Sequence, residues 1–164
     1  MCVSKAGLTL IVLLGLVVAV PQTVVAQSRF GIDIFGVSYH YQSRTYLDAS
    51  GELRHYEQAN PGLGAEYVVH SNGRFVVSAE AGAYRDSKDR TNVFAGPALR
   101  FRLGPHLLLG GALVVMTSRT YGTPIAPLPV VTAHWKHVGL NGTWIPSLAR
   151  RESGAFALFS TIYF

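Results

Sequence analysis

Few side chains in this sequence could act together as an acid, a base or a nucleophile. His40 carries an imidazole, which moves protons readily near neutral pH, and it falls at the end of the first predicted strand. Asp86 and Ser87 place a carboxylate beside a hydroxyl just after the third predicted strand. Cys2, the single cysteine, lies in the N-terminal segment expected to be removed, so neither disulfides nor thiol chemistry are expected. These side chains therefore indicate proton transfer and reactions of a hydroxyl group.

Metal and cofactor sites are not expected. His134 and His137 are three positions apart on a predicted strand, where successive side chains alternate between faces, so the two rings point to opposite sides. The sequence contains no phosphate-binding glycine loop and no nucleotide fingerprint. We expect no metal and no cofactor.

The first 26 residues resemble an export signal. Lys5 supplies a positive start, residues 7–20 are apolar, and Val24-Val25-Ala26 ends the segment with small residues. The mature chain would be residues 27–164, long enough for one domain. Hydrophobic residues make up 49% of the sequence and charged residues 14%, which excludes a disordered chain. After residue 26 no apolar run is long enough for a membrane-spanning helix.

The mature sequence divides into eight stretches of alternating or apolar character, most of them near the length of a tilted membrane strand. They are 31–41, 62–69, 74–84, 92–103, 106–116, 127–135, 139–145 and 155–164. The connections alternate between tight turns and longer polar loops, which is typical of outer-membrane barrels. We therefore expect an all-β fold: an eight-stranded antiparallel outer-membrane β-barrel, with a soluble periplasmic barrel as the alternative.

Side-chain alternation predicts which face of each strand points to lipid. Phe35, Val37 and Tyr39 share one face of the first strand, as Phe156, Leu158 and Ile162 do in the last. The residues expected to face inward are Ile34, Gly36, Ser38, His40, Ser78, Glu80, Gly82, Tyr84, Gly96, Ala98, Leu108, Gly110, Ala112, Val114 and Met116. This mixture of small and apolar groups predicts an interior with room for an acyl chain. The alternative is that the larger side chains simply fill it.

Several stretches resemble the lipid A palmitoyltransferases. They are Ser38-Tyr39-His40, Tyr84-Arg85-Asp86-Ser87, Pro127-Leu128-Pro129, Trp144-Ile145-Pro146 and the aromatic end Ile162-Tyr163-Phe164. Each motif is weak alone, but all occur in order and at the family's approximate spacing, over most of the chain from Gly31 onward. One departure is that residues 27–30 are too few for the amphipathic helix that precedes the barrel in some members.

The resemblance implies a function and a site. The family transfers a palmitoyl chain from a phospholipid to lipid A, and its catalytic residues match His40, Asp86 and Ser87. Two routes stay open: Ser87 could carry the acyl group, with His40 as base and Asp86 orienting it, or His40 could deprotonate the lipid A hydroxyl directly. The implied partners are a phospholipid donor and lipid A. We expect a monomer in the bacterial outer membrane, with the site facing outward and no role for nucleic acid.

Further positions are implied to contact substrate. Arg119 matches a family arginine and would contact a lipid phosphate. Pro127, Pro129 and Pro146 cannot donate to strand ladders and match the gaps through which lipids reach the family's site from the membrane; the alternative is that they only break strand ends. Gly96 and Ala98 align with the cavity floor, where Ala98 replaces a glycine and should favour chains slightly shorter than palmitate. Met116 faces the same interior.

Two other functions remain open at this point. A lipid A deacylase or phospholipase could use His40 with Ser87 or Ser43 to direct water at an ester. A non-catalytic structural barrel would need none of these groups. Space for an acyl chain separates the two enzymes from the structural barrel.

Overall fold

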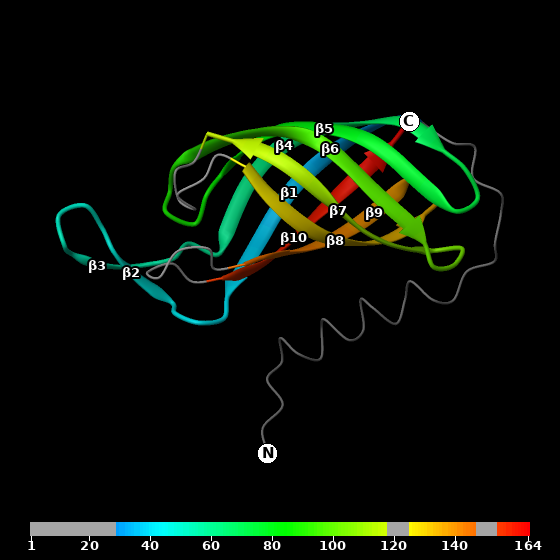
Figure 1. Ribbon diagram of the computed structural model, residues 1–164. Helices are drawn as coiled ribbons and strands as arrows, with labels where there is room; N and C mark the ends of the chain where they lie inside the picture. The colour runs from blue at the N-terminus through cyan, green and yellow to red at the C-terminus, as the bar shows by residue number, and fades with distance from the viewer. Residues whose placement is uncertain (1–28, 118–124, 147–153) are drawn as a thin grey trace, which may run out of the picture.

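The computed structural model describes residues 29–117, 125–146 and 154–164, which form a closed antiparallel barrel (Figure 1). Its strands are β1 (Phe30–His40), β4 (Ala59–Ser71), β5 (Phe75–Arg85), β6 (Thr91–Arg102), β7 (Leu107–Met116), β8 (Ile125–Trp135), β9 (Val138–Ile145) and β10 (Ala155–Tyr163). Each strand pairs with its neighbours along the chain, and β1 closes the barrel by pairing with both β4 and β10. The predicted eight-stranded antiparallel barrel is confirmed. The proposed export signal, residues 1–26, lies outside the described residues.

The two ends of the barrel differ as the sequence predicts. Tight turns follow β4, β6 and β8; in the first, Asn72 Oδ1 accepts hydrogen bonds from the N–H groups of Arg74 and Phe75 at 2.8 and 2.9 Å. We call this the turn end, and the opposite end, where the longer connections lie, the loop end. Among the described residues, no helix is long and apolar enough to cross a bilayer.

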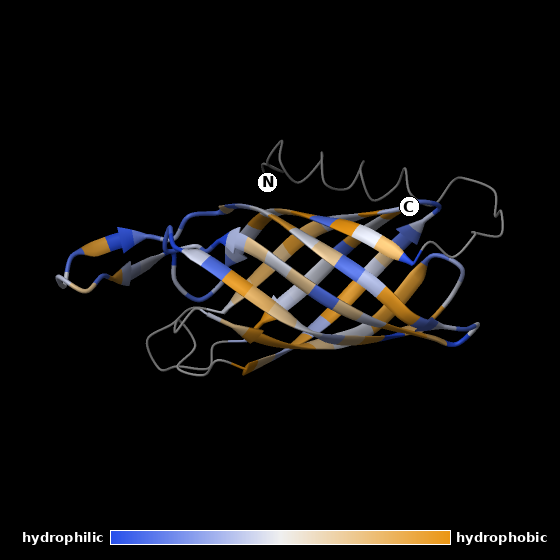
Figure 2. Cartoon of the chain, turned by 90° about the horizontal axis from the view of Figure 1, so that it is seen from above, coloured by the Kyte–Doolittle hydropathy of each residue, from blue (hydrophilic) through white to orange (hydrophobic). Residues whose placement is uncertain are grey.

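The first loop contains a small hairpin that the sequence analysis did not predict. Strands β2 (Thr45–Leu47) and β3 (Leu53–His55) pair with each other and project beyond the loop end (Figure 1). Asp48 closes its turn, accepting hydrogen bonds from Ser50 and from the N–H of Glu52, and the Ser50 hydroxyl holds the pKa of Asp48 below its usual range. Gly51 adopts a φ of 82°, which favours glycine. Figure 2 shows that the hairpin is more hydrophilic than the barrel wall.

A β-bulge in β1 corrects the predicted alternation. The pairing of β1 with both neighbours shifts by one residue between Phe35 and Val37. One extra residue exchanges the inward and outward faces of a strand. Ile34, expected inside, is 43% exposed, and Phe35, expected outside, packs inside against Tyr84, Phe94 and Phe159. Beyond the bulge, Ser38 and His40 are buried as predicted.

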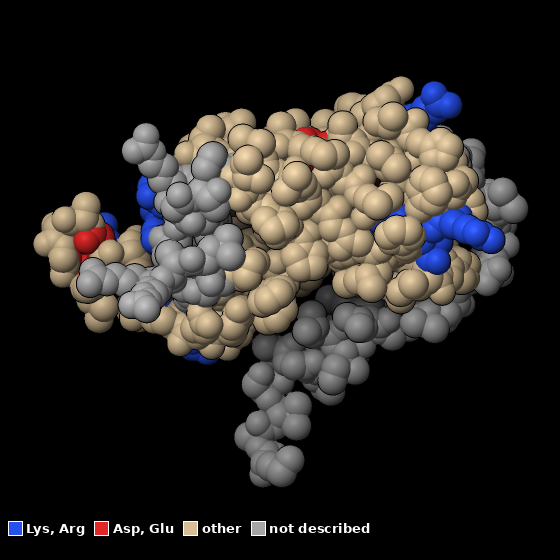
Figure 3. All heavy atoms as spheres, viewed as in Figure 1, with Lys and Arg blue, Asp and Glu red and all other residues tan. Residues whose placement is uncertain are grey.

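The outer surface carries two belts of exposed aromatic side chains. Tyr39, Tyr41, Trp144 and Phe156 lie toward the loop end, and Phe30, Tyr67, Phe101 and Phe164 lie toward the turn end. The exposed side chains between them are largely aliphatic, and Figure 3 shows Lys and Arg concentrated at the two ends of the visible face. The nine residue steps from Phe30 to Tyr39 correspond to roughly 23 Å along the barrel axis, for about 3.3 Å per residue and a tilt of about 40°.

The turn half of the interior is filled by charged and polar side chains. Arg100 Nη1 donates to Glu66 at 2.5 Å, its Nη2 donates to Glu80, and the Tyr163 hydroxyl donates to Glu66 at 2.8 Å. A second chain of hydrogen bonds joins Thr132, Asn141, Thr161 and Asp33. The expectation of a small and apolar interior is therefore wrong for the positions that carry these networks, whereas Leu108, predicted to face inward, is buried beside Val68 and Val76. The buried carboxylates are stabilised here because each finds a donor across the barrel.

Candidate active site

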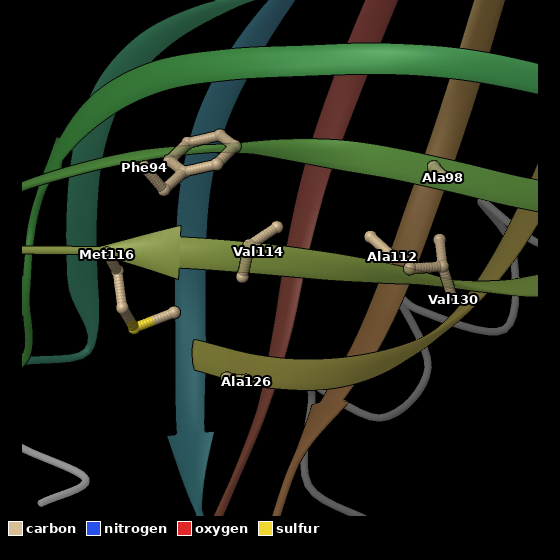
Figure 4. Close-up of a cluster of buried hydrophobic side chains, with 7 residues drawn as sticks. All are labelled: Phe94, Ala98, Ala112, Val114, Met116, Ala126 and Val130. Carbon is tan, nitrogen blue, oxygen red and sulfur yellow. The ribbon is translucent and has the colours of Figure 1, made fainter. Parts of the chain in front are cut away.

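The loop half of the barrel encloses a cavity of about 110 Å³. Its inner wall is largely apolar and includes Phe35, Phe94, Ala112, Val114, Met116, Leu128 and Val130. Asp33 and Glu80, which belong to the charged and polar networks of the interior, also line it. Figure 4 shows the buried apolar cluster that supplies part of this wall, with Phe94 and Met116 toward the loop end and Ala112 deeper in the barrel. The mouth is polar and is lined by Ser38, His40, Tyr56, Asn60, Asp86, Ser87 and Lys88. A largely apolar cavity thus lies beneath a mouth whose side chains can transfer protons.

All three predicted catalytic residues lie at this mouth. β1 contributes His40 and, two residues earlier on the same face, Ser38. The Ser38 and Ser87 hydroxyls lie 3.1 Å apart and share a hydrogen bond. The segment after the hairpin fixes both: Ser38 N–H donates to Gln58 O at 2.8 Å, and Glu57 N–H donates to Ser87 O at 2.8 Å. Residues distant in sequence are therefore held together by backbone bonds.

Asp86 builds the turn that presents Ser87. Its Oδ1 accepts hydrogen bonds from the N–H groups of Lys88 and Arg90, both at 2.9 Å, and its Oδ2 accepts from the Arg90 guanidinium at 3.2 and 3.3 Å. Asp89 in the same turn has a φ of 64°, the left-handed region that Asp tolerates better than most residues. These contacts give Asp86 a structural function in the turn, different from the histidine-orienting function considered in the sequence analysis.

His40 is held by an aromatic stack. Its ring lies 4.0 Å from that of Tyr56, with 4° between the planes, and Tyr46 packs on Tyr56 at 4.9 Å. Among the described residues no hydrogen-bond partner reaches the buried His40 Nδ1. The Lys88 ammonium lies 5.2 Å from the centre of the Tyr46 ring. Stacking thus fixes the imidazole plane without using a ring nitrogen.

Asn60 is a site residue that the sequence analysis missed. It is buried, lines the cavity, and donates through Nδ2 to Arg85 O at 3.0 Å and to Ser87 Oγ at 3.4 Å. The second strand was predicted to begin at Gly62, whereas β4 begins at Ala59. Extending the inward alternation of Gly62 back by two positions would have identified Asn60.

The predicted substrate-binding residues have different positions. Met116 lines the cavity, whereas Ala98 is buried in the apolar cluster beside Ala112 and is not among the lining residues. Gly96 lies so close to Leu113 O that a Cβ would overlap it, so this position needs glycine. Arg119 lies outside the described residues.

The prolines coincide with a shortened ladder between β8 and β9. Pro127 and Pro129 pair with β7, but pairing with β9 begins only at Val130 opposite Thr143. Thr143 Oγ1 donates to Pro129 O at 2.9 Å beside this opening. Pro146 directly follows the end of β9 and is half-buried. The ladder is therefore missing at the loop end, beside the cavity wall.

Comparison with known proteins adds little to this geometry. No protein-family model matches the chain, and no curated protein matches it in sequence. The backbone structure of the Yersinia pestis outer membrane protein Ail in a phospholipid bilayer nanodisc is 13% identical, with a TM-score of 0.46, over 84% of this chain and 100% of that chain. The strand pairing of this chain itself establishes an eight-stranded antiparallel β-barrel with a cavity at its loop end.

Proposed function

We propose that this protein is an outer-membrane acyltransferase, which moves a fatty acyl chain from a phospholipid to lipid A. The observation that carries the proposal is the apolar cavity whose polar mouth brings together His40, Ser87 and Ser38. A structural barrel needs no such space. The resemblance to the lipid A palmitoyltransferases supplies the donor and the acceptor, and no cofactor is required.

Membrane insertion is supported by the outer surface. Aromatic belts that flank an aliphatic band are typical of barrels in a bilayer, where the band is about 25 Å tall. The separation of roughly 23 Å between Phe30 and Tyr39 suits this thickness. Because long loops usually face the outside in outer-membrane barrels, we place the cavity mouth at the extracellular end. There it would meet lipid A in the outer leaflet.

The cavity suits one acyl chain. Its volume of about 110 Å³ and its largely apolar wall suit a flexible hydrocarbon chain. The expectation from Ala98 is a chain slightly shorter than palmitate. The opening beside Pro127, Pro129 and Pro146 would admit the chain from the membrane.

The site supports direct transfer better than a covalent acyl-serine. In a serine triad the carboxylate orients the histidine, whereas Asp86 here is bound by Arg90 and the turn N–H groups. In direct transfer His40 takes the proton of the acceptor hydroxyl, whose oxygen bonds to the acyl carbon. The donor ester C–O bond breaks, and the leaving alkoxide takes the proton from His40. Ser38 and Ser87 hydroxyls would stabilise the carbonyl oxygen as its negative charge grows.

The test is the mass of lipid A from a Gram-negative host that lacks such an enzyme and expresses the full chain. A gain of one acyl mass is expected; loss of an acyl chain would identify a hydrolase, and no change would favour a structural barrel. His40→Ala and Ser87→Ala should abolish the gain without preventing barrel assembly. His106→Ala is the control, because His106 lies at the turn end, where its ring contacts His134 O.

A further inference from the structure

Among the residues that the structure describes, one hydrogen-bond acceptor at the cavity mouth, Asn60 Oδ1, has no partner. Asn60 is 8% exposed, and among the described residues no donor reaches its Oδ1. A buried polar atom left without a hydrogen bond is costly, so nearly all such atoms in folded proteins are satisfied. An unsatisfied atom of a residue that lines a cavity therefore points to a group that arrives with a ligand.

The orientation of the Asn60 amide is fixed by its neighbour. Arg85 O, a carbonyl, can only accept a hydrogen bond, so the atom that faces it at 3.0 Å must be the amide nitrogen. The same nitrogen reaches Ser87 Oγ at 3.4 Å. The oxygen of the amide therefore points elsewhere and needs a donor, either O–H or N–H.

The Asn60 side chain lies close to the reacting groups. The Ser87 hydroxyl links Asn60 to Ser38, and Ser38 is two residues from His40 on the same face of β1. The reacting hydroxyl of the acyl acceptor gives its only proton to His40, so it cannot also donate a hydrogen bond to Asn60 Oδ1. The partner of Asn60 Oδ1 must then be a second donor near the reacting hydroxyl.

We infer that Asn60 is a positioning residue that selects acyl acceptors with a second hydrogen-bond donor beside the reacting hydroxyl. The acceptor class is thus a vicinal diol of a sugar or a hydroxyl next to an amide N–H, rather than a simple alcohol. This inference rests on the proposed function and adds the chemistry by which the acceptor is recognised.

The experiment compares two small acceptors that differ by one hydroxyl. Purified full-length protein in detergent receives a phosphatidylcholine donor with either 1-butanol or 1,2-butanediol, and mass spectrometry measures the butyl esters formed. We expect the wild type to prefer the diol by about tenfold. Asn60→Ala should remove this preference: transfer to 1-butanol falls because Asn60 also supports Ser87, and transfer to 1,2-butanediol falls by about a further tenfold. Asn60→Asp, which keeps an acceptor oxygen, should restore part of the preference.

Asn141→Ala is the matched control, because Asn141 is also buried but belongs to the hydrogen-bonded chain in the turn half. Its diol preference should equal that of the wild type. If Asn60→Ala reduces transfer to both alcohols equally, or leaves the diol preference intact, the inference is wrong and the proposed function still stands. If the wild type esterifies neither alcohol and no lipid A, the proposed function fails and the inference fails with it.

Discussion

The two halves of the barrel interior differ in how completely side chains fill them. In the turn half, Arg100 on β6 donates hydrogen bonds to Glu66 on β4 and Glu80 on β5, and all three side chains are buried. In the loop half, the side chains leave a cavity of about 110 Å³, and its mouth is lined by His40, Ser38 and Ser87. The difference teaches that one barrel can combine a half filled by an ion-pair network with a half that retains internal space.

The largest expected effect is on stability and comes from removing the cation of the buried cluster in the turn half. Arg100→Met leaves two buried carboxylates without their cation, and such unpaired charges cost about 3–5 kcal/mol. We expect the variant to unfold at clearly lower urea concentration in detergent, as followed by intrinsic fluorescence. Adding Glu66→Gln and Glu80→Gln should recover much of the loss, since the uncompensated charges are then gone. Equal stability of the single variant and the wild type would contradict a stabilising role for this cluster.

The second prediction concerns a substitution at the cavity mouth that leaves the Arg100 cluster of the turn half unchanged. Tyr56→Ala removes the ring stacked on His40, so the imidazole is no longer held in plane, and transfer should fall by about 10- to 100-fold. Unfolding by urea should change far less than for Arg100→Met. Tyr56→Phe keeps the stack and should keep most of the activity. If the Phe variant is as impaired as the Ala variant, the hydroxyl of Tyr56 matters and the stack does not.

A third variant distinguishes the two functions considered for Asp86. Asp86→Asn keeps an oxygen that can accept from the N–H groups of Lys88 and Arg90, so the turn should persist and activity should fall less than about tenfold. A carboxylate that orients a catalytic histidine would instead lose about 10⁴-fold on this change. The rate of lipid A acylation decides between them, with Asp86→Ala expected to disorder the turn.

The smallest effect concerns the length of the acyl chain. Ala98→Gly removes a methyl group from the packed layer next to Ala112, and we expect the preferred chain to lengthen by about one methylene. Mass spectrometry of lipid A modified from a donor mixture measures the shift. Ala79→Gly is the control, because Ala79 lies on the neighbouring strand with its side chain on the outer face. If the preferred acyl chain is unchanged in Ala98→Gly, residues other than Ala98 form the floor of the cavity.

Much of the architecture could be predicted from the residues. The eight strands, the alternation of tight turns and long loops, and the common end of His40 and Ser87 all follow from local patterns. Asn60 was missed because a proline follows it, and strand patterns are hard to recognise beside proline. The Arg100 cluster was missed because its three members come from three strands, and their meeting depends on the register between those strands.

The sequence by itself determined the closed antiparallel barrel, because repeated two-residue alternation and tight turns leave few other folds for an apolar chain without long helices. Only the tertiary structure decided which side chains meet inside. The bulge in β1 inverts the faces on either side of Gly36, so Phe35 packs inside while His40 still reaches the mouth. Such a register shift is set by pairing with β4 and β10, segments distant in sequence, and no local pattern encodes it.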